Sequence, residues 1–140
     1  MNSLQLNDLH KSFGTNRVLA GLDLDVPAGS LTAILGPSGS GKTTLLRLLA
    51  GFERPDRGTI RVGESVLDAG GVHVHPEHRR FGYVPQEGGL FPPLTVQANV
   101  TFGLSRAARR RGAADLLDMV GLSDLARRYP HQLSGGQQQR

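Results

Sequence analysis

The stretch that most constrains this chain runs over residues 31–46, where an apolar segment meets a glycine-rich turn and then a leucine-rich segment. The turn has the spacing G-x-x-x-x-G-K-[ST], whose fixed positions are Gly36, Gly41, Lys42 and Thr43. This order predicts a buried strand over Leu31–Leu35, a loop, and a helix that begins near Gly41.

The chemistry of phosphate binding explains why each fixed position needs its residue type. Glycines let successive backbone N–H groups point inward and form an anion nest, and the positive end of the following helix dipole lies beneath it. Lys42 can reach the outer phosphates, and the Thr43 hydroxyl can bind Mg²⁺. A chance glycine turn before a helix is the alternative, but strand, turn and helix occur in the required order. The segment therefore predicts a nucleoside triphosphate site.

Length and composition set the class of protein. A chain of 140 residues suits one modest domain with its own core, and 38% hydrophobic residues are ordinary for a globular protein. Without cysteine, neither disulfides nor thiolate metal sites can form. The sequence has no apolar run of membrane-spanning length and no signal-peptide pattern, so we expect a cytoplasmic chain that can dock on membrane proteins.

The charge of the chain is basic, with a formal net charge of +4. A basic protein can bind nucleic acid, but the arginines are scattered apart from Arg109-Arg110-Arg111, and no basic face interleaved with aromatic residues is visible. No nucleic-acid partner is therefore expected. Lys11 and Lys42 are the only lysines, so the lysine at the glycine-rich turn indicates a specific role for that position.

Apolar and polar residues alternate in the first 26 residues, which predicts two antiparallel strands joined by a turn at Asn16. Thr43–Ala50 should form a largely buried helix ended by Gly51, and two short strands should follow over Thr59–Val62 and from Phe81 to the loop at Gln86.

Three histidines lie close together over residues 73–78, a pattern that can hold a metal ion. The segment offers no cysteine and no ordered carboxylate, so a solvated loop is the favoured interpretation. Farther on, Thr95 is a candidate N-cap for a helix over 96–104, with further helices over 113–120 and 122–128.

The chain ends in Leu133-Ser134-Gly135-Gly136-Gln137 and a polar tail. A serine before two glycines suits a helix N-terminus that can contact an anion, so this segment is a second phosphate-binding candidate.

With both motifs present, the whole chain resembles the nucleotide-binding subunit of an ATP-binding-cassette (ABC) transporter. Leu133 follows Lys42 by 91 positions, and the LSGGQ signature at this distance is far more specific than the glycine-rich turn alone. The stretches GFERPDRGTI and FGYVPQEGGLFPPLTVQANVTFGL most resemble importers of ferric iron, sulfate, polyamines, thiamine or maltose, with ferric iron closest.

The resemblance implies a role for each matching residue. Phe13 stacks on adenine, Gln86 contacts Mg²⁺ and the attacking water, and residues 90–96 form the surface on which a permease helix rests. The phosphates of ATP are held by a loop made of Gly36, Pro37, Ser38, Gly39, Ser40, Gly41, Lys42, Thr43 and Thr44. The γ-phosphate bound by the other subunit is contacted by Ser134, Gly135, Gly136 and Gln137.

These roles imply a head-to-tail dimer with ATP and Mg²⁺ between the subunits, on the inner face of the membrane. The implied partners are a second nucleotide-binding subunit, permease subunits and, indirectly, a solute-binding protein. A cassette ATPase acting in DNA repair or translation is the alternative, although 91 residues leave no room for a long coiled coil between the motifs.

The resemblance also implies an α/β fold of the P-loop NTPase class, divided into a β subdomain with the phosphate-loop core (1–86), a helical subdomain (87–134) and the start of a helix (135–140). Family members continue into a strand with aspartate, a catalytic glutamate and a switch histidine. The chain is therefore expected to be an N-terminal fragment with negligible ATPase activity. Loss of the C-terminal part of the core sheet should expose residues 31–35 and 81–84.

Overall fold

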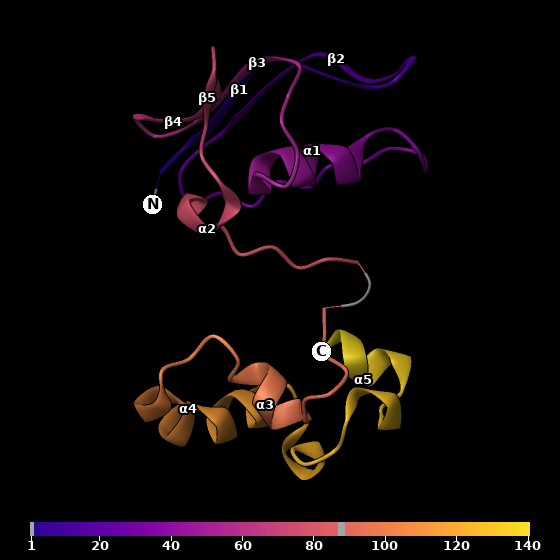
Figure 1. Cartoon of the computed structure of the whole chain (residues 1–140), viewed down its shortest axis with the longest axis vertical. Helices are drawn as coiled ribbons and strands as arrows, with labels where there is room; N and C mark the ends of the chain where they lie inside the picture. The colour runs from indigo at the N-terminus through magenta and orange to yellow at the C-terminus, as the bar shows by residue number, and fades with distance from the viewer. Residues whose placement is uncertain (1, 87–88) are drawn as a thin grey trace. The chain divides into compact units, whose positions relative to one another are not determined.

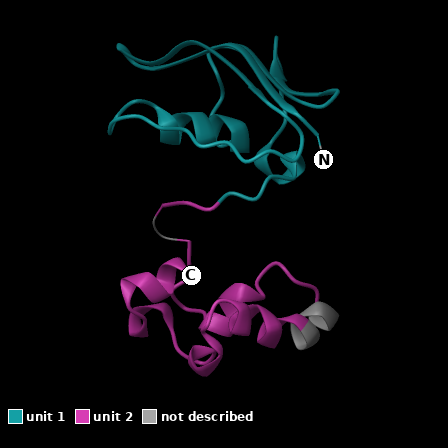
Figure 2. Cartoon of the chain, turned by 180° about the vertical axis from the view of Figure 1, so that it is seen from behind, with its two compact units in different colours: residues 1–83 teal, residues 84–140 magenta. Residues whose placement is uncertain are grey.

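A computed structural model describes residues 2–86 and 89–140, with the backbone alone over 106–111. The chain divides into two compact units, residues 1–83 and 84–140, which Figure 2 colours separately. Within the described residues, no helix is both long and apolar enough to cross a membrane.

The first unit is built on a five-stranded antiparallel sheet in the order β2-β1-β3-β4-β5 (Figure 1). The predicted strand pair is confirmed, since Leu4 of β1 lies opposite Val26 of β2 and Phe13 opposite Asn16. The strands are β1 (Leu4–Phe13), β2 (Asn16–Val26), β3 (Arg57–Val62), β4 (Ser65–Ala69) and β5 (Val72–His73).

Helix α1 (Lys42–Ala50) packs on this sheet through a leucine-rich face, and α2 (Pro76–Arg79) is a single turn after β5. Leu45 and Leu48 of α1 share one core cluster with Leu6, Leu9 and Ile60 of the strands. The helix begins and ends where predicted. It is buried on one side alone, however, because Leu46 is 46% exposed, so the expectation of a largely buried helix was wrong in that respect.

Two predicted strands are absent from the described residues. Residues 31–35 have irregular backbone and Leu35 is 90% exposed, while residues 81–84 are also irregular and Val84 is 90% exposed. A strand needs a neighbour for its backbone hydrogen bonds, and among the described residues none pairs with either segment. The predicted exposure of both apolar segments is therefore found, and the prediction that they form strands was wrong.

The second unit is helical and has its own small core, formed by Val96, Leu117, Leu122 and Leu133. Thr95 caps the N-terminus of α3 as predicted, but α3 ends at Val100, short of the expected 104, and the expected helix over 122–128 is a single 3₁₀ turn. The elements are α3 (Val96–Val100), α4 (Arg106–Met119), η1 (Ser123–Leu125), η2 (Pro130–Gln132) and α5 (Gly135–Gln139).

Candidate functional site: a phosphate-binding loop and a serine-capped helix

The loop before α1 is anchored to the sheet at Gly41. This residue has φ 89° and lies so close to β2 that an added Cβ would be 3.0 Å from Val18 Cγ1 and 3.2 Å from Leu19 Cδ2. Glycine is therefore required both by the left-handed backbone and by the space. The requirement fixes the start of α1 against β2.

Lys42 is the first residue of α1, and its side chain turns back over the loop. Its Nζ donates hydrogen bonds to the carbonyl oxygens of Gly36 at 2.8 Å and Pro37 at 2.6 Å, and it lies 3.3 Å from Ser40 Oγ. The backbone N–H of Ser40 also bonds Pro37 O at 3.3 Å. The loop thus folds around the Lys42 ammonium, which places a positive charge inside the loop.

The N-terminus of α1 adds to this positive charge. Within the described residues, no side chain caps Gly41 by a hydrogen bond, and the first turn of α1 holds no acidic residue. The first N–H groups of a helix have no acceptor within it, and they carry the positive end of the helix dipole. An anion placed at this end of α1 would meet these N–H groups together with the Lys42 ammonium.

The other predicted loop residues are open to solvent. Residues 36–40 and Thr43 are exposed, and Thr44 is half-buried. The Thr43 hydroxyl is thus available on the first turn of α1, while Pro37, Ser38 and Gly39 form the outer rim of the loop. An exposed rim with a positive base has the form that suits a ligand carrying several phosphate groups.

Phe13, the predicted adenine contact, lies in the same unit at the last position of β1. Its side chain is 47% exposed, and Lys11 Nζ lies 5.1 Å from the centre of its ring. Phe13 is paired with Asn16, two positions before Val18, the residue that packs against Gly41. The exposed ring and the start of α1 therefore both lie near the turn that joins β1 to β2.

Ser134, in the second unit, caps α5. The Ser134 N–H donates to Gln137 Oε1 at 2.9 Å, and the Gln137 N–H donates to Ser134 Oγ at 3.3 Å, which makes a reciprocal capping box. The predicted helix start is confirmed, and α5 follows with Gly135 and Gly136 in its first turn. An added Cβ would meet no atom within 4 Å at either glycine, so this surface is open.

Gln86, the predicted Mg²⁺ and water contact, is exposed in irregular backbone at the start of the second unit. The first unit thus contains Phe13, the loop and Lys42, and the second contains Gln86 and the signature segment. Residues 87 and 88 lie outside the described part of the chain.

The histidine segment is only in part the solvated loop that its sequence predicted, because His75 and His78 are exposed but His73 is not. His73 belongs to β5 with its side chain 8% exposed, and His73 Nδ1 lies 2.7 Å from the carboxylate of Asp68 on β4. The described residues contain no cluster of three or more potential metal ligands among histidine, cysteine and acidic side chains.

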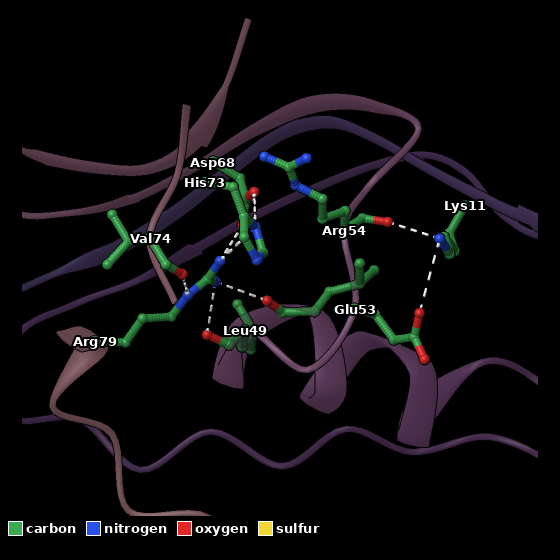
Figure 3. Close-up of polar contacts among 9 residues, drawn as sticks. Lys11, Leu49, Glu53, Arg54, Asp68, His73, Val74 and Arg79 are labelled. Atoms are coloured by element: carbon green, nitrogen blue, oxygen red, sulfur yellow. Dashed lines mark hydrogen bonds and ion pairs between the residues drawn. The ribbon is translucent and has the colours of Figure 1, made fainter. Parts of the chain in front are cut away.

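Sequence reasoning missed Arg79, whose side chain is fully buried beside His73 (Figure 3). Its guanidinium donates to Asp68, to Val74 O at 2.6 Å, and to Leu48 O and Leu49 O at 2.8 and 3.0 Å. The last two are carbonyl groups at the C-terminal end of α1. An arginine just before an apolar segment gives no local signal that it will cap a helix thirty residues earlier.

Comparison with known sequences places these observations in a family. The sequence profile described as ABC transporter matches residues 19–140. The chain is 58% identical over its full length to an "Fe(3+) ions import ATP-binding protein" of Pseudomonas fluorescens, 53% identical to one of Mesorhizobium japonicum and 49% identical to one of Yersinia enterocolitica.

The chain spans about 40% of the length of these relatives. The family match includes most of β2, the loop of Lys42 and the capped segment at Ser134, while Phe13 lies before its first residue. On this evidence the chain belongs to the ABC transporter family.

Proposed function

We propose that this chain carries the ATP-binding part of the energy-coupling subunit of an ABC importer, and that ferric iron is the solute of the whole system. The observation that carries the proposal is the loop of Lys42, which combines an ammonium, an uncapped helix N-terminus and an exposed glycine-rich rim. The names of the relatives as ferric-ion import ATP-binding proteins support the solute.

In the proposed site the chain's own residues bind and orient ATP. The backbone of residues 36–44 surrounds the phosphates, and Lys42 exchanges its carbonyl contacts for phosphate oxygens. The Phe13 ring offers its exposed face to the adenine. These contacts hold the triphosphate at a fixed distance from the Phe13 ring, which serves as the platform for the base.

Mg²⁺ is the proposed metal cofactor, and its donors fit oxygen chemistry. The Thr43 hydroxyl and the Gln86 amide oxygen are both on exposed residues, and Mg²⁺ takes a few protein oxygens together with phosphate oxygens and water. When bound, the ion neutralises phosphate charge. Gln86 is proposed to orient the attacking water, with Lys42 in support as the charge that stabilises the transferred phosphoryl group.

The second half of the proposed site comes from another copy of the subunit. In this arrangement Ser134, Gly135, Gly136 and Gln137 of one subunit contact the γ-phosphate held by the loop of the other. The capping box supports the proposal because it fixes the Ser134 hydroxyl at the N-terminal end of α5. Neither subunit then completes a site alone.

Residues 90–96 are the proposed docking surface for the permease subunits, with the solute-binding protein acting through them. Val96, at the end of this stretch, is buried in the core of the second unit and would support the surface from beneath. Phe91 supports the docking proposal, because it is 46% exposed and stacks on Phe102 at a centroid distance of 4.3 Å. Asn99 holds the loop, because its Oδ1 accepts from Phe91 N–H at 2.7 Å and its Nδ2 donates to Leu94 O at 3.0 Å. The subunit would therefore work from the cytoplasmic face of the membrane.

For the whole subunit we propose a P-loop NTPase core in which residues 31–35 and 81–84, which form no strand among the described residues, pair with further strands of a parallel sheet. Their exposure supports this, because parallel strands are buried on both faces. The proposed division is a β subdomain with the loop core (1–86), a helical subdomain (87–134) and a post-signature helix (135–140). The 140 residues alone are expected to bind ATP but to hydrolyse it very slowly.

Nucleotide titration with Mg²⁺, followed by calorimetry on the purified chain, tests the proposal. Lys42→Met should weaken ATP binding by at least about tenfold, since a charge-assisted contact to phosphate is lost. Arg47→Met is the matched control, because Arg47 lies on the same helix, is 45% exposed and pairs with Glu53.

The control should bind ATP like the unaltered chain. If the chain shows no ATP binding, or if Lys42→Met and Arg47→Met bind equally well, the proposed site is wrong. Circular dichroism of both variants separates loss of binding from loss of fold.

A further inference from the structure

The side chain of Lys11 lies at the end of β1 among oxygen atoms of the segment that follows α1 (Figure 3). Its Nζ donates to Arg54 O at 2.7 Å and lies 3.6 Å from Asp56 Oδ1 and 3.9 Å from Glu53 Oε2. The side chain is 12% exposed. These oxygens fix the position of the ammonium and leave it largely screened from water.

The segment of residues 53–56 that supplies these oxygens is itself tied down. Asp56 N donates to His10 O at 2.9 Å, and Ser12 N donates to Asp56 Oδ2 at 2.7 Å. Glu53 also pairs with Arg47 of α1 at 3.2 Å. The ammonium therefore sits in a frame that joins the end of β1 to the helix that starts at the phosphate loop.

Phe13 is the next residue but one after Lys11, and the pairing of β1 with β2 is irregular between Lys11 and Ser12. The ammonium lies 5.1 Å from the ring centre, within the range of a cation–π contact. Because these oxygens already fix the position of the ammonium, the cation–π contact restrains the Phe13 ring and not the ammonium. It holds a half-exposed aromatic side chain at the end of a strand.

We propose that Lys11 is a positioning residue for the nucleotide base: its ammonium holds one face of the Phe13 ring so that the other face is presented to adenine. The inference rests on the proposed function, because it needs Phe13 as the base platform. A ring already ordered loses less conformational entropy when the base stacks on it. The cation also draws electron density from the ring, which favours stacking on an electron-rich purine.

Another explanation is that Lys11 merely closes residues 53–56 onto β1. The two roles differ in what they affect. A structural role would lower stability and weaken every ligand of the loop. A positioning role acts through Phe13 and affects ligands that carry a base. Inorganic tripolyphosphate, which occupies phosphate contacts without a base, is the probe that separates them.

The experiment measures the dissociation constants of ATP and of inorganic tripolyphosphate for the 140-residue chain and four single variants. Lys11→Met should weaken ATP binding about three- to fivefold and leave tripolyphosphate binding unchanged. Lys11→Arg, which keeps the cation, should restore ATP binding. Phe13→Leu should weaken ATP binding by more than about fivefold. Arg54→Met removes an equal charge from an exposed residue of the same segment and should change neither constant.

A double variant completes the test. Adding Lys11→Met to Phe13→Leu should cause no further loss of ATP affinity, because the ring through which Lys11 acts is gone. Equal weakening of ATP and tripolyphosphate by Lys11→Met, or an undiminished loss in the Phe13→Leu background, would overturn the inference and leave the proposed function standing. Failure of the unaltered chain to bind either probe would overturn both.

Discussion

Gly39 and Gly41 show how the phosphate loop depends on single residues. Both adopt a positive φ, 80° at Gly39 and 89° at Gly41. An added Cβ would meet no atom within 4 Å at Gly39, whereas at Gly41 it would lie 3.0 Å from Val18 Cγ1. Substitution at Gly39 should therefore test backbone strain alone, whereas substitution at Gly41 tests backbone strain together with the packing of the loop against β2.

Gly39→Ala should lower the free energy of unfolding by about 1 kcal/mol, because alanine must adopt a left-handed backbone. Gly41→Ala should lower it by about 3 kcal/mol, since the methyl group also crowds β2. Urea unfolding followed by circular dichroism measures both. Equal losses in the two variants would show that the contact with Val18 does not hold the loop.

The carboxylate of Asp8 interacts with two basic side chains. Asp8 has φ 49°, and its carboxylate lies 2.7 Å from His10 Nε2 and contacts Arg57. Its backbone N–H donates to Asp23 Oδ1 at 2.7 Å. The hydrogen bond with His10, and next the one with Arg57, hold the pKa of Asp8 below its ordinary value of 3.8.

A carboxyl group whose pKa is lowered by folding stabilises the protein above its unfolded pKa, and this stability is lost as the pH falls through the folded value. We therefore expect the urea midpoint to fall as the pH drops below about 4, and to fall less steeply in Asp8→Asn. Asparagine tolerates the positive φ at this position. A pH profile of Asp8→Asn that matches the unaltered chain would contradict the assignment.

Among the elements, α1 depends on contacts at both ends. Gly41 fixes its start against β2, and Arg79 bonds Leu48 O and Leu49 O near its end. Arg79 also contacts Asp68, whose side chain is 3% exposed. The charge of Arg79 thus balances a buried carboxylate and the negative end of the α1 dipole at once.

Arg79→Met should lower the free energy of unfolding by about 3–5 kcal/mol, because it removes the guanidinium from the buried carboxylate of Asp68 and leaves that group with its contact to His73 alone. Arg80→Met is the control, since Arg80 is exposed and adjacent, and its effect should stay within about 0.5 kcal/mol. Thermal unfolding measures both. If the two variants have the same midpoint, the contacts of Arg79 do not stabilise α1.

The elements that could be predicted are those determined by nearby residues. Alternating apolar residues identified β1 and β2, and the serine before two glycines identified the start of α5. Residues 31–35 have the pattern of a strand, but strand formation needs a partner that no described residue supplies. Arg79 was missed for a similar reason, because its acceptors on α1 lie thirty residues away.

In the candidate site, too, contacts between near neighbours in the sequence could be predicted, and contacts between distant segments could not. The spacing of Gly36, Gly41 and Lys42 predicted a phosphate loop, and its local geometry depends on contacts within six residues. The relation of Lys11 to Phe13 could not be predicted, because the oxygens that fix the ammonium come from residues 53–56, more than forty positions along the chain.

In the proposed assembly, ATP is shared between two copies of the subunit. The loop of Lys42 and the segment of Ser134 belong to separate compact units of the chain. Each is proposed to be half of a site, completed by the opposite half on another copy. Two defective copies should therefore complement each other when each is altered in a different half of the site.

Sedimentation of a mixture of two variants tests this most directly. Lys42→Met should remove the loop half of the site, and Gly136→Asp should remove the signature half by bringing a carboxylate to the phosphate, at a position where a Cβ meets no atom within 4 Å. With ATP, the unaltered chain should form a dimer and each variant alone a monomer, while the mixture should form a heterodimer with one complete site. Dimers of Gly136→Asp alone as stable as the unaltered dimer, or a mixture that stays monomeric, would show that ATP is not shared between two copies.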